Sequence, residues 1–163
     1  MTTMTIRPAA EADHPAILDI VRPILAAGDT YAVDSDLDDA GIVAFWFLPA
    51  HEVFVAEADG QVLGTYYLMA NRQGGGSHVA NCGYMTAAAA RGRGLARAMC
   101  EHSLERARQR GFRAMQFNHV VSTNTVAVAL WQKLGFDIVG TLPAAFNHPQ
   151  HGYVDAYVMF QTL

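Results

Sequence analysis

The chain has 163 residues, of which 52% are apolar and 16% are charged, and its net charge is −4 at pH 7. This composition is typical of one globular domain spanning residues 1–163, and it excludes an intrinsically disordered chain. The acidic balance excludes a general nucleic-acid binder, which needs a basic face. The 2 cysteines are too few for a disulfide framework or a four-cysteine zinc site, so we expect a reduced, cytoplasmic protein.

No segment of the sequence predicts a membrane protein. The longest apolar stretches, such as residues 42–48, are far shorter than the ~20 residues that span a bilayer. The chain begins Met-Thr-Thr-Met-Thr-Ile-Arg-Pro, without the basic start and apolar run of a signal peptide. We therefore expect no membrane association.

The chain is expected to begin with a strand and a helix. Alternating apolar residues predict the strand at residues 3–7. Asp13 is a suitable N-cap for the helix, and Pro15 fits its first turn, where a missing N–H costs nothing. Pro23 is expected to kink this helix or to end its regular part.

A second helix and a hairpin follow. The helix is expected to start at Asp38 or Asp39 and to close at Pro49. Asp59-Gly60 separates two alternating apolar runs, which is a strong hairpin signal. The two strands of this hairpin are expected at Glu52–Ala58 and Gln61–Ala70.

The rest of the chain is expected to alternate strands with helices and to end in two strands. Gly111 follows the first of these helices and Gly135 follows the second, and each glycine suits a helix end. The strands are expected at residues 78–86, 114–120, 136–142 and 153–161, and the helices at 94–110 and 124–134. This order predicts a mixed α/β sheet with helices on its faces.

The most informative segment lies where a strand gives way to the long helix, and it reads Ala90-Arg91-Gly92-Arg93-Gly94-Leu95-Ala96. Glycines let a backbone come close to a ligand, and the N–H groups of a helix start attract an anion. The spacing of a P-loop is absent, and a dinucleotide fingerprint normally lies in an early βαβ unit. We therefore predict a phosphate or pyrophosphate site, with an ordinary basic turn as the alternative.

Two motifs carry a resemblance to a known family. Arg91-x-x-Gly94-x-Ala96 resembles the signature Gln/Arg-x-x-Gly-x-Gly/Ala of the GNAT acetyltransferase superfamily. A downstream segment is similar to the family's Asn-x-x-Ala-x-x-Leu-Tyr-x-Lys-x-Gly-Phe, and it reads Asn124-x-x-Ala127-Val128-x-Leu130-Trp131-x-Lys133-Leu134-Gly135-Phe136. The element order also matches, so the resemblance covers nearly the whole chain. It implies a single N-acetyltransferase domain with a mixed, mostly antiparallel sheet, in which the parallel strands 78–86 and 114–120 splay apart.

The resemblance also implies acetyl-CoA as the co-substrate and no metal. The pantetheine arm would lie between the splayed strands and pair with the backbone near Met85 and Thr86, with Asn124 and Trp131 of the second motif beside it. The pyrophosphate would lie on the turn, at Arg91, Gly92, Arg93, Gly94, Leu95 and Ala96. The segment His148-Pro149-Gln150-His151 holds two histidines without a third ligand, so a polar loop is favoured over a metal site.

A further likeness, to the phosphinothricin-type branch, rests on short segments: Arg7-Pro8-Ala9, Asp29-Thr30-Tyr31, and Gly140-Thr141-Leu142 through Tyr153-Val154-Asp155. That branch has a glutamate before the pyrophosphate turn, at the position that Asn81 occupies here. An amide cannot accept a proton, so Asn81 is expected to orient a water, and phosphinothricin is weakened as a substrate.

A second departure concerns the proton donor. Trp131 stands where the family often has a tyrosine that protonates the leaving thiolate, and an indole N–H is not a workable proton source. His119, on the second splayed strand, is therefore a candidate for proton transfer. The alternatives are a covalent intermediate on Cys82 and packing roles for His78, His119 and Trp131.

The acceptor side is expected to involve the first helical region and the last hairpin. The sequence predicts a small-molecule amine as the acceptor and leaves open a protein amine and a homodimer. The alternative function is a non-catalytic acyl-CoA-binding or sensor domain. Four acidic residues could attract a cation, although a solvated helix start is the simpler interpretation: Asp34, Asp36, Asp38 and Asp39. The aromatic candidates for the acceptor pocket are Tyr31, Phe117 and Tyr153, with Phe45, Trp46 and Phe146.

Overall fold

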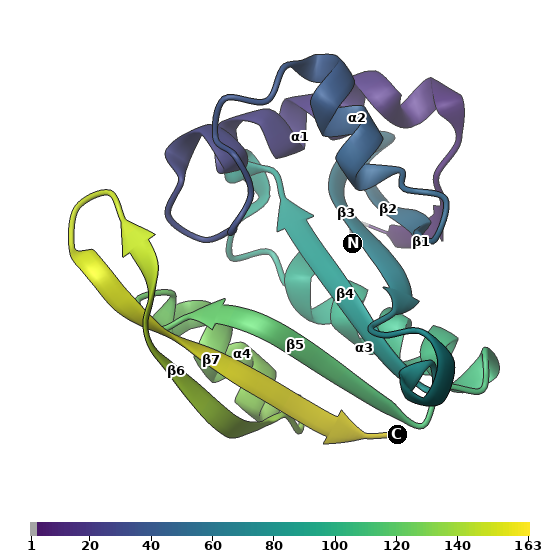
Figure 1. Cartoon of the computed structure of the whole chain (residues 1–163). Helices are drawn as coiled ribbons and strands as arrows, with labels where there is room; N and C mark the ends of the chain where they lie inside the picture. Colours follow the sequence, from purple (N-terminus) through teal and green to yellow (C-terminus); the bar gives the residue numbers. More distant parts are fainter. Residues whose placement is uncertain (1–2) are drawn as a thin grey trace.

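The computed structural model describes residues 3–163, which form a seven-stranded sheet in the order β1-β2-β3-β4-β5-β7-β6 (Figure 1). All neighbouring strands are antiparallel except β4 and β5. The strands are β1 Met4–Pro8, β2 Glu52–Ala58, β3 Gln61–Ala70, β4 Val79–Thr86, β5 Ala114–Val121, β6 Asp137–His148 and β7 Gly152–Thr162. The helices are α1 His14–Ala27, α2 Asp39–Trp46, α3 Leu95–Gln109 and α4 Thr125–Lys133. The predicted mixed α/β sheet is confirmed.

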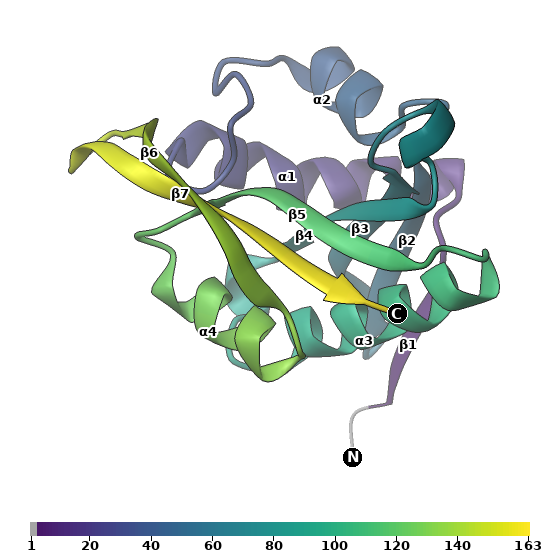
Figure 2. The same cartoon turned by 60° about the horizontal axis from the view of Figure 1, so that its bottom comes forward.

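Helices cover both faces of the sheet, with α1 and α2 on one side and α3 and α4 on the other (Figure 2). The side chains of successive strand residues point to opposite faces of the sheet, so each strand contributes side chains to the hydrophobic core on either face. Along β2, Val53 and Val55 are buried in the core under α1 and α2, whereas Phe54 and Ala56 are buried in the core under α3 and α4. The sheet is thus the middle layer of three.

The parallel strands β4 and β5 separate soon after they begin. Their pairing is limited to Val79 with Ala114 and Ala80 with Met115. Beyond these pairs the two strands diverge (Figure 1). A gap in the middle of the sheet is therefore the feature that most distinguishes this fold from a continuous sheet, as the family resemblance implied.

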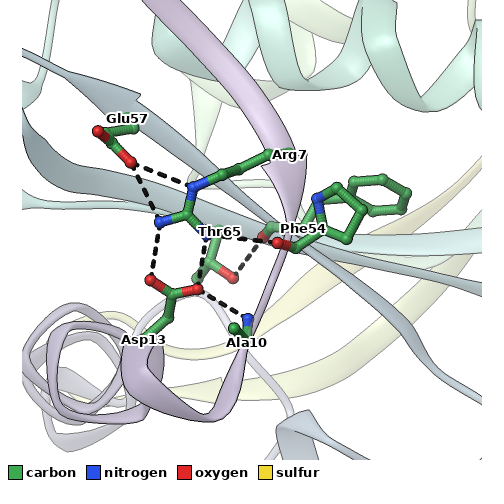
Figure 3. A network of polar contacts seen from close by, with 7 residues as sticks. Arg7, Ala10, Asp13, Phe54, Glu57 and Thr65 are labelled. Carbon is green, nitrogen blue, oxygen red and sulfur yellow. Dashed lines mark hydrogen bonds and ion pairs between the residues drawn. The ribbon is translucent and has the colours of Figure 1, made fainter.

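Arg7 ties the edge strand β1 to the start of α1. Its guanidinium donates to the carboxylate of Asp13 at 2.8 and 2.9 Å and to Glu57 at 3.1 Å (Figure 3). Asp13 also accepts from the backbone N–H of Ala10 at 2.8 Å. Hydrogen bonds from Arg7 hold the pKa of Asp13 below its ordinary value, although burial opposes this shift. The network fixes the first turn of α1, the helix that leads into the loop carrying Tyr31.

The expectation that Pro23 could end the first helix is wrong. The helix α1 runs through Pro23 and ends at Ala27. Pro23 itself is exposed, so its ring meets no neighbouring layer. Apolar residues before and after it are buried against the sheet and keep the helix in place: Ile20, Val21 and Leu25.

Two other helix boundaries differ in detail from the prediction. Asp13 stands directly before α1, but its side chain binds Arg7 instead of capping the helix. The helix α2 ends at Trp46, earlier than Pro49, because Phe47 already has a non-helical backbone with φ −104° and ψ 39°.

The last two strands are longer than predicted. The strand β6 continues past Leu142 to His148, and β7 starts at Gly152. The register with β7 shifts after Leu142, where the N–H of Ala144 donates to the carboxylate of Asp155 at 2.9 Å. This bulge interrupts the alternation of apolar residues, which is why the sequence did not reveal the continuation. The segment around His148 is therefore the tip of a hairpin.

Candidate functional site

The backbone of β4 lines one side of the gap. In a strand, the N–H and C=O groups of successive residues point to alternate edges. The carbonyl of His78 accepts from Arg113, before β5, whereas the carbonyl of Val79 accepts from Asn71, after β3. The backbone N–H and C=O groups of the even-numbered residues of β4 therefore face the gap.

By this alternation, the backbone groups of Tyr84 and Thr86 face the gap, whereas those of Met85 pair toward Thr65 of β3. The side chain of Met85 is buried in the core under α1 and α2. The sequence indicated Met85 and Thr86, so Tyr84 is the gap-facing residue that it missed. The alternation rule could have identified it only with the pairing partners of β4 in hand.

An aromatic wall closes the gap on the face of α3 and α4. Its rings are Tyr84, Phe117 and Trp131, and the ring centroid of Trp131 lies 5.1 Å from Tyr84 and 5.2 Å from Phe117. The hydroxyl of Tyr84 shares a 2.7 Å hydrogen bond with Ser103 of α3, which fixes the ring. Burial raises the pKa of Tyr84 well above its ordinary value, so this hydroxyl stays neutral.

Tyr31 reaches the gap from the opposite face. It lies in the loop between α1 and α2 and packs against the core under those helices. Its hydroxyl donates to the carbonyl of Tyr84 at 2.6 Å. Burial raises the pKa of Tyr31, so the hydroxyl remains a neutral donor across the physiological range.

Asn81 and His119 lie on the two diverging strands. The amide of Asn81 donates to the carbonyl of Gln116 at 2.8 Å and so bridges β4 and β5 where they part. His119 lies where the register of β5 with β7 shifts, between Phe117 and Val120. Its Nε2 is buried and has no hydrogen-bond partner among residues 3–163. A buried polar atom without a partner is costly, so this imidazole is available to a group that enters the site.

The glycine-rich turn lies at the end of β4. Gly92 and Gly94 have φ of 77° and 81°, the left-handed region that favours glycine. Leu95, at 2% exposure, anchors the start of α3 in the core, and Ala96 follows it half-buried. Arg91 and Arg93 are exposed, and Arg93 lies 3.4 Å from Asp59 of the β2–β3 turn. Backbone donors at a helix start with two arginines beside them suit a polyanion.

The remaining candidates have more ordinary surroundings. Asn124 caps α4, since its side chain accepts from the N–H of Ala127 at 3.4 Å. Tyr153 is 75% exposed near the tip of the hairpin. Asp38 caps α2, and Asp39 forms an ion pair with Arg22 at 2.8 Å. Tyr31, Asn81 and Phe117 thus border the gap, whereas Asn124, Asp38 and Asp39 make polar contacts elsewhere and Tyr153 is exposed.

Cys82 is an unfavourable nucleophile. It is a free, buried cysteine, and burial raises the pKa of its thiol far above the ordinary value. Because the thiolate is the reactive form, these surroundings disfavour an acyl-cysteine. Within residues 3–163 no three His, Cys, Asp or Glu side chains are grouped so as to hold a metal ion. In the same part of the chain, no helix is long and apolar enough to cross a membrane.

A small cavity of about 140 Å³ lies where three loops meet near the gap. The loop after α1 contributes Asp29 and Thr30, the loop after β5 contributes Thr123 and Asn124, and the hairpin contributes His148. His148 is 6% exposed, and its Nδ1 accepts from the N–H of Gln150 at 3.1 Å. The other ring nitrogen therefore carries the proton, and it is a donor.

The chain matches known proteins over most of its length. A family model described as the acetyltransferase (GNAT) family matches residues 16–136. A GCN5-related N-acetyltransferase from Kribbella flavida is 50% identical, with a TM-score of 0.94 over 98% of each chain. A putative acetyltransferase from Salmonella typhimurium, solved with its cofactor acetyl-CoA, is 25% identical, with a TM-score of 0.85 over 99% of this chain and 94% of that chain.

A curated relative is similar over a shorter stretch. The N-acetyltransferase aca1 of Schizosaccharomyces pombe is 34% identical over 113 residues, which are 68% of this chain and 54% of that protein. The chain therefore spans about half the length of this relative.

Proposed function

This chain belongs to the GNAT family of acetyltransferases, and we propose that it transfers an acetyl group from acetyl-CoA directly to a primary amine of a small molecule. The observation that carries the proposal is the gap between β4 and β5, which ends at the glycine-rich turn. A strand edge with unpaired backbone groups can take up an extended ligand by strand addition. The backbone of Tyr84 and Thr86 is suited to the amides of the pantetheine arm.

The turn would hold the pyrophosphate. The N–H groups at the start of α3 supply donors, and Arg91 and Arg93 supply positive charge. Bound there, acetyl-CoA would supply the thioester, which the gap would hold near Asn81 and His119. Orientation of two reactants in this way is worth about 7–11 kcal/mol of the barrier in favourable cases.

The chemistry needs a neutral amine and a stable leaving group. The amine nitrogen attacks the thioester carbonyl, the C–S bond breaks, and the amine proton is passed to a base. His119 has a buried ring nitrogen without a partner, and Asn81 can hold a water, so these two residues are the candidates for that step. A CoA thiol has a pKa near that of free cysteine, about 8.5, so its thiolate can leave near neutral pH without a tyrosine acid.

The acceptor would enter from the face of α1 and α2, past Tyr31. The cavity of Asp29, Thr30, Thr123, Asn124 and His148 lies on its way and offers a carboxylate, hydroxyls and an imidazole donor. Such a small polar site suits the head of a small-molecule amine better than a protein lysine. Both cysteines are free thiols, which fits a reaction in the cytoplasm.

A thiol-release assay tests the proposal. The protein is incubated with acetyl-CoA and a panel of small amines and peptides, and released CoA is measured. We expect release that depends on one class of small amine. Trp131, in place of a tyrosine acid, is the observation that favours the second candidate, a non-catalytic acyl-CoA sensor. A rise in melting temperature with acetyl-CoA, without thiol release for any amine, would support the sensor.

A further inference from the structure

We propose that Tyr31 limits the transferred acyl group to about two carbons by closing the gap between β4 and β5 at the level of Tyr84. The inference rests on the proposed function, because it assumes that acyl-CoA occupies this gap. It assigns to Tyr31 a specificity-determining role that is separate from recognition of the amine.

The hydroxyl of Tyr31 marks a fixed point on the edge of the gap. It donates at 2.6 Å to the carbonyl of Tyr84, and this carbonyl faces the gap rather than β3. The N–H of Tyr84 and the backbone groups of Thr86 remain for a ligand at this level. An extended ligand that continued along this edge beyond Tyr84, toward Cys82, would meet the side chain of Tyr31.

Aromatic rings bound this level of the gap on both faces. The ring of Tyr31 packs against the core under α1 and α2. On the other face, the rings of Tyr84, Phe117 and Trp131 form the wall under α3 and α4, with centroids 5.1 to 5.8 Å apart. An acyl chain that continued beyond Tyr84 would have to pass between Tyr31 and these rings.

Contacts of their own hold the rings of the wall in place, so we expect this level of the gap to discriminate acyl groups by length. Tyr84 is held by Ser103 at 2.7 Å, and Phe117 stacks on Phe136 with centroids 4.3 Å apart. A propionyl or butyryl group would have to displace Tyr31 and break its buried hydrogen bond. One additional methylene in a hydrophobic pocket changes specificity by roughly 10- to 200-fold, so the effect is measurable.

The test compares acetyl-, propionyl- and butyryl-CoA with one amine acceptor. Tyr31→Ala removes the ring and should raise the propionyl-to-acetyl ratio of kcat/KM by about tenfold or more. Tyr31→Phe keeps the ring and should change this ratio by less than about threefold. Ser35→Ala, an exposed position in the same loop, is the matched control and should behave as wild type. If Tyr31→Ala does not fold, Tyr31→Leu takes its place.

Melting shifts with each acyl-CoA give a second readout that does not need turnover. We expect butyryl-CoA to stabilise Tyr31→Ala more than wild type. A folded Tyr31→Ala variant that binds acetyl-CoA with an unchanged acyl preference would overturn the inference. So would a wild-type protein that uses butyryl-CoA as well as acetyl-CoA. If no acyl-CoA stabilises the wild type, the proposed function fails, and the inference fails with it.

Discussion

We expect Trp131 to shape the site without taking part in proton transfer. It is 9% exposed and packs against Tyr84 and Phe117. Its indole N–H can donate a hydrogen bond but cannot supply a proton near neutral pH. We expect the amine proton to pass instead to His119 or to a water held by Asn81, on the two diverging strands.

Trp131→Phe should therefore keep the wall and cost less than about tenfold in kcat, or under about 1.4 kcal/mol. His119→Ala and Asn81→Ala should lose more, in kcat as well as in kcat/KM, because under the proposed function these residues contact the reacting groups. Steady-state kinetics with one amine measures all three variants.

Val126→Ala is the control for α4, because Val126 is 81% exposed on the same helix as Trp131. Thermal melting of each variant shows whether the loss of the bond between Asn81 and Gln116 unfolds the protein. An inactive Trp131→Phe variant beside near-normal His119→Ala and Asn81→Ala variants would make Trp131 the proton donor and contradict this account.

At the scale of elements, the start of α3 is expected to hold the phosphates. A ligand that binds only the folded state adds about 2.7 kcal/mol of stability at a hundred times its dissociation constant. Gly94→Asp places a side chain and a negative charge at this helix start, so most of the melting shift with acetyl-CoA should disappear. Thermal denaturation with and without acetyl-CoA measures it.

Gly74→Asp is the matched control for that variant. Like Gly94, Gly74 has a positive φ, 56°, and open space where a Cβ would lie, and it precedes β4, at the opposite end of that strand from the turn. It should retain the full shift. A Gly94→Asp variant that retains the shift as well would remove the turn from the binding site.

The ion pair between Arg7 and Asp13, at the start of α1, predicts that the stability of the fold depends on pH. The pKa of Asp13 is lower in the folded chain than in the unfolded chain, because Arg7 donates to the carboxylate. Its stabilising effect is therefore complete above the ordinary aspartate value of about 3.9 and is lost as the pH falls through the lowered value. Asp13→Asn should cost about 1–2 kcal/mol at pH 7, since Arg7 is partly exposed and keeps Glu57.

Urea denaturation of wild type and Asp13→Asn at several pH values measures this effect. The difference between the two should shrink at pH values well below about 4. Asp36→Asn, an exposed acid, is the control and should show a negligible difference throughout. A difference for Asp13→Asn that stays constant as the acid range is entered would show that the ion pair is not its source.

At the scale of the whole molecule, we expect the two functions of the site to be divided between the two faces of the sheet. Basic residues gather on one side: 7 of the 11 Lys and Arg residues lie between residues 91 and 113, in the turn, on α3 and just after it. The other side carries α1, α2 and the loop with Tyr31. Under the proposed function, this arrangement would let a polyanionic cosubstrate and an amine approach the gap from different faces.

The fold was predictable because its signals are local. The Asp59-Gly60 turn, the glycines after α3 and α4, and the two motifs fix the order of elements, and the motifs locate Asn81 and Trp131 by counting. Tyr84 was not predictable, because which backbone edge faces the gap depends on the partners of β4. The hydrogen bond from Tyr31 to Tyr84 joins residues far apart in the chain, and no periodicity indicates it.

The most direct test of the central claim follows the acetyl group itself. Isotopically labelled acetyl-CoA is mixed with the protein and an active amine, and mass spectrometry is applied to the small-molecule products and to the intact protein. We expect the label on the amine nitrogen, none on the protein, and the same result with Cys82→Ala, since burial raises the pKa of this thiol. Label trapped on Cys82, with a Cys82→Ala variant that binds acetyl-CoA but transfers nothing, would contradict direct transfer.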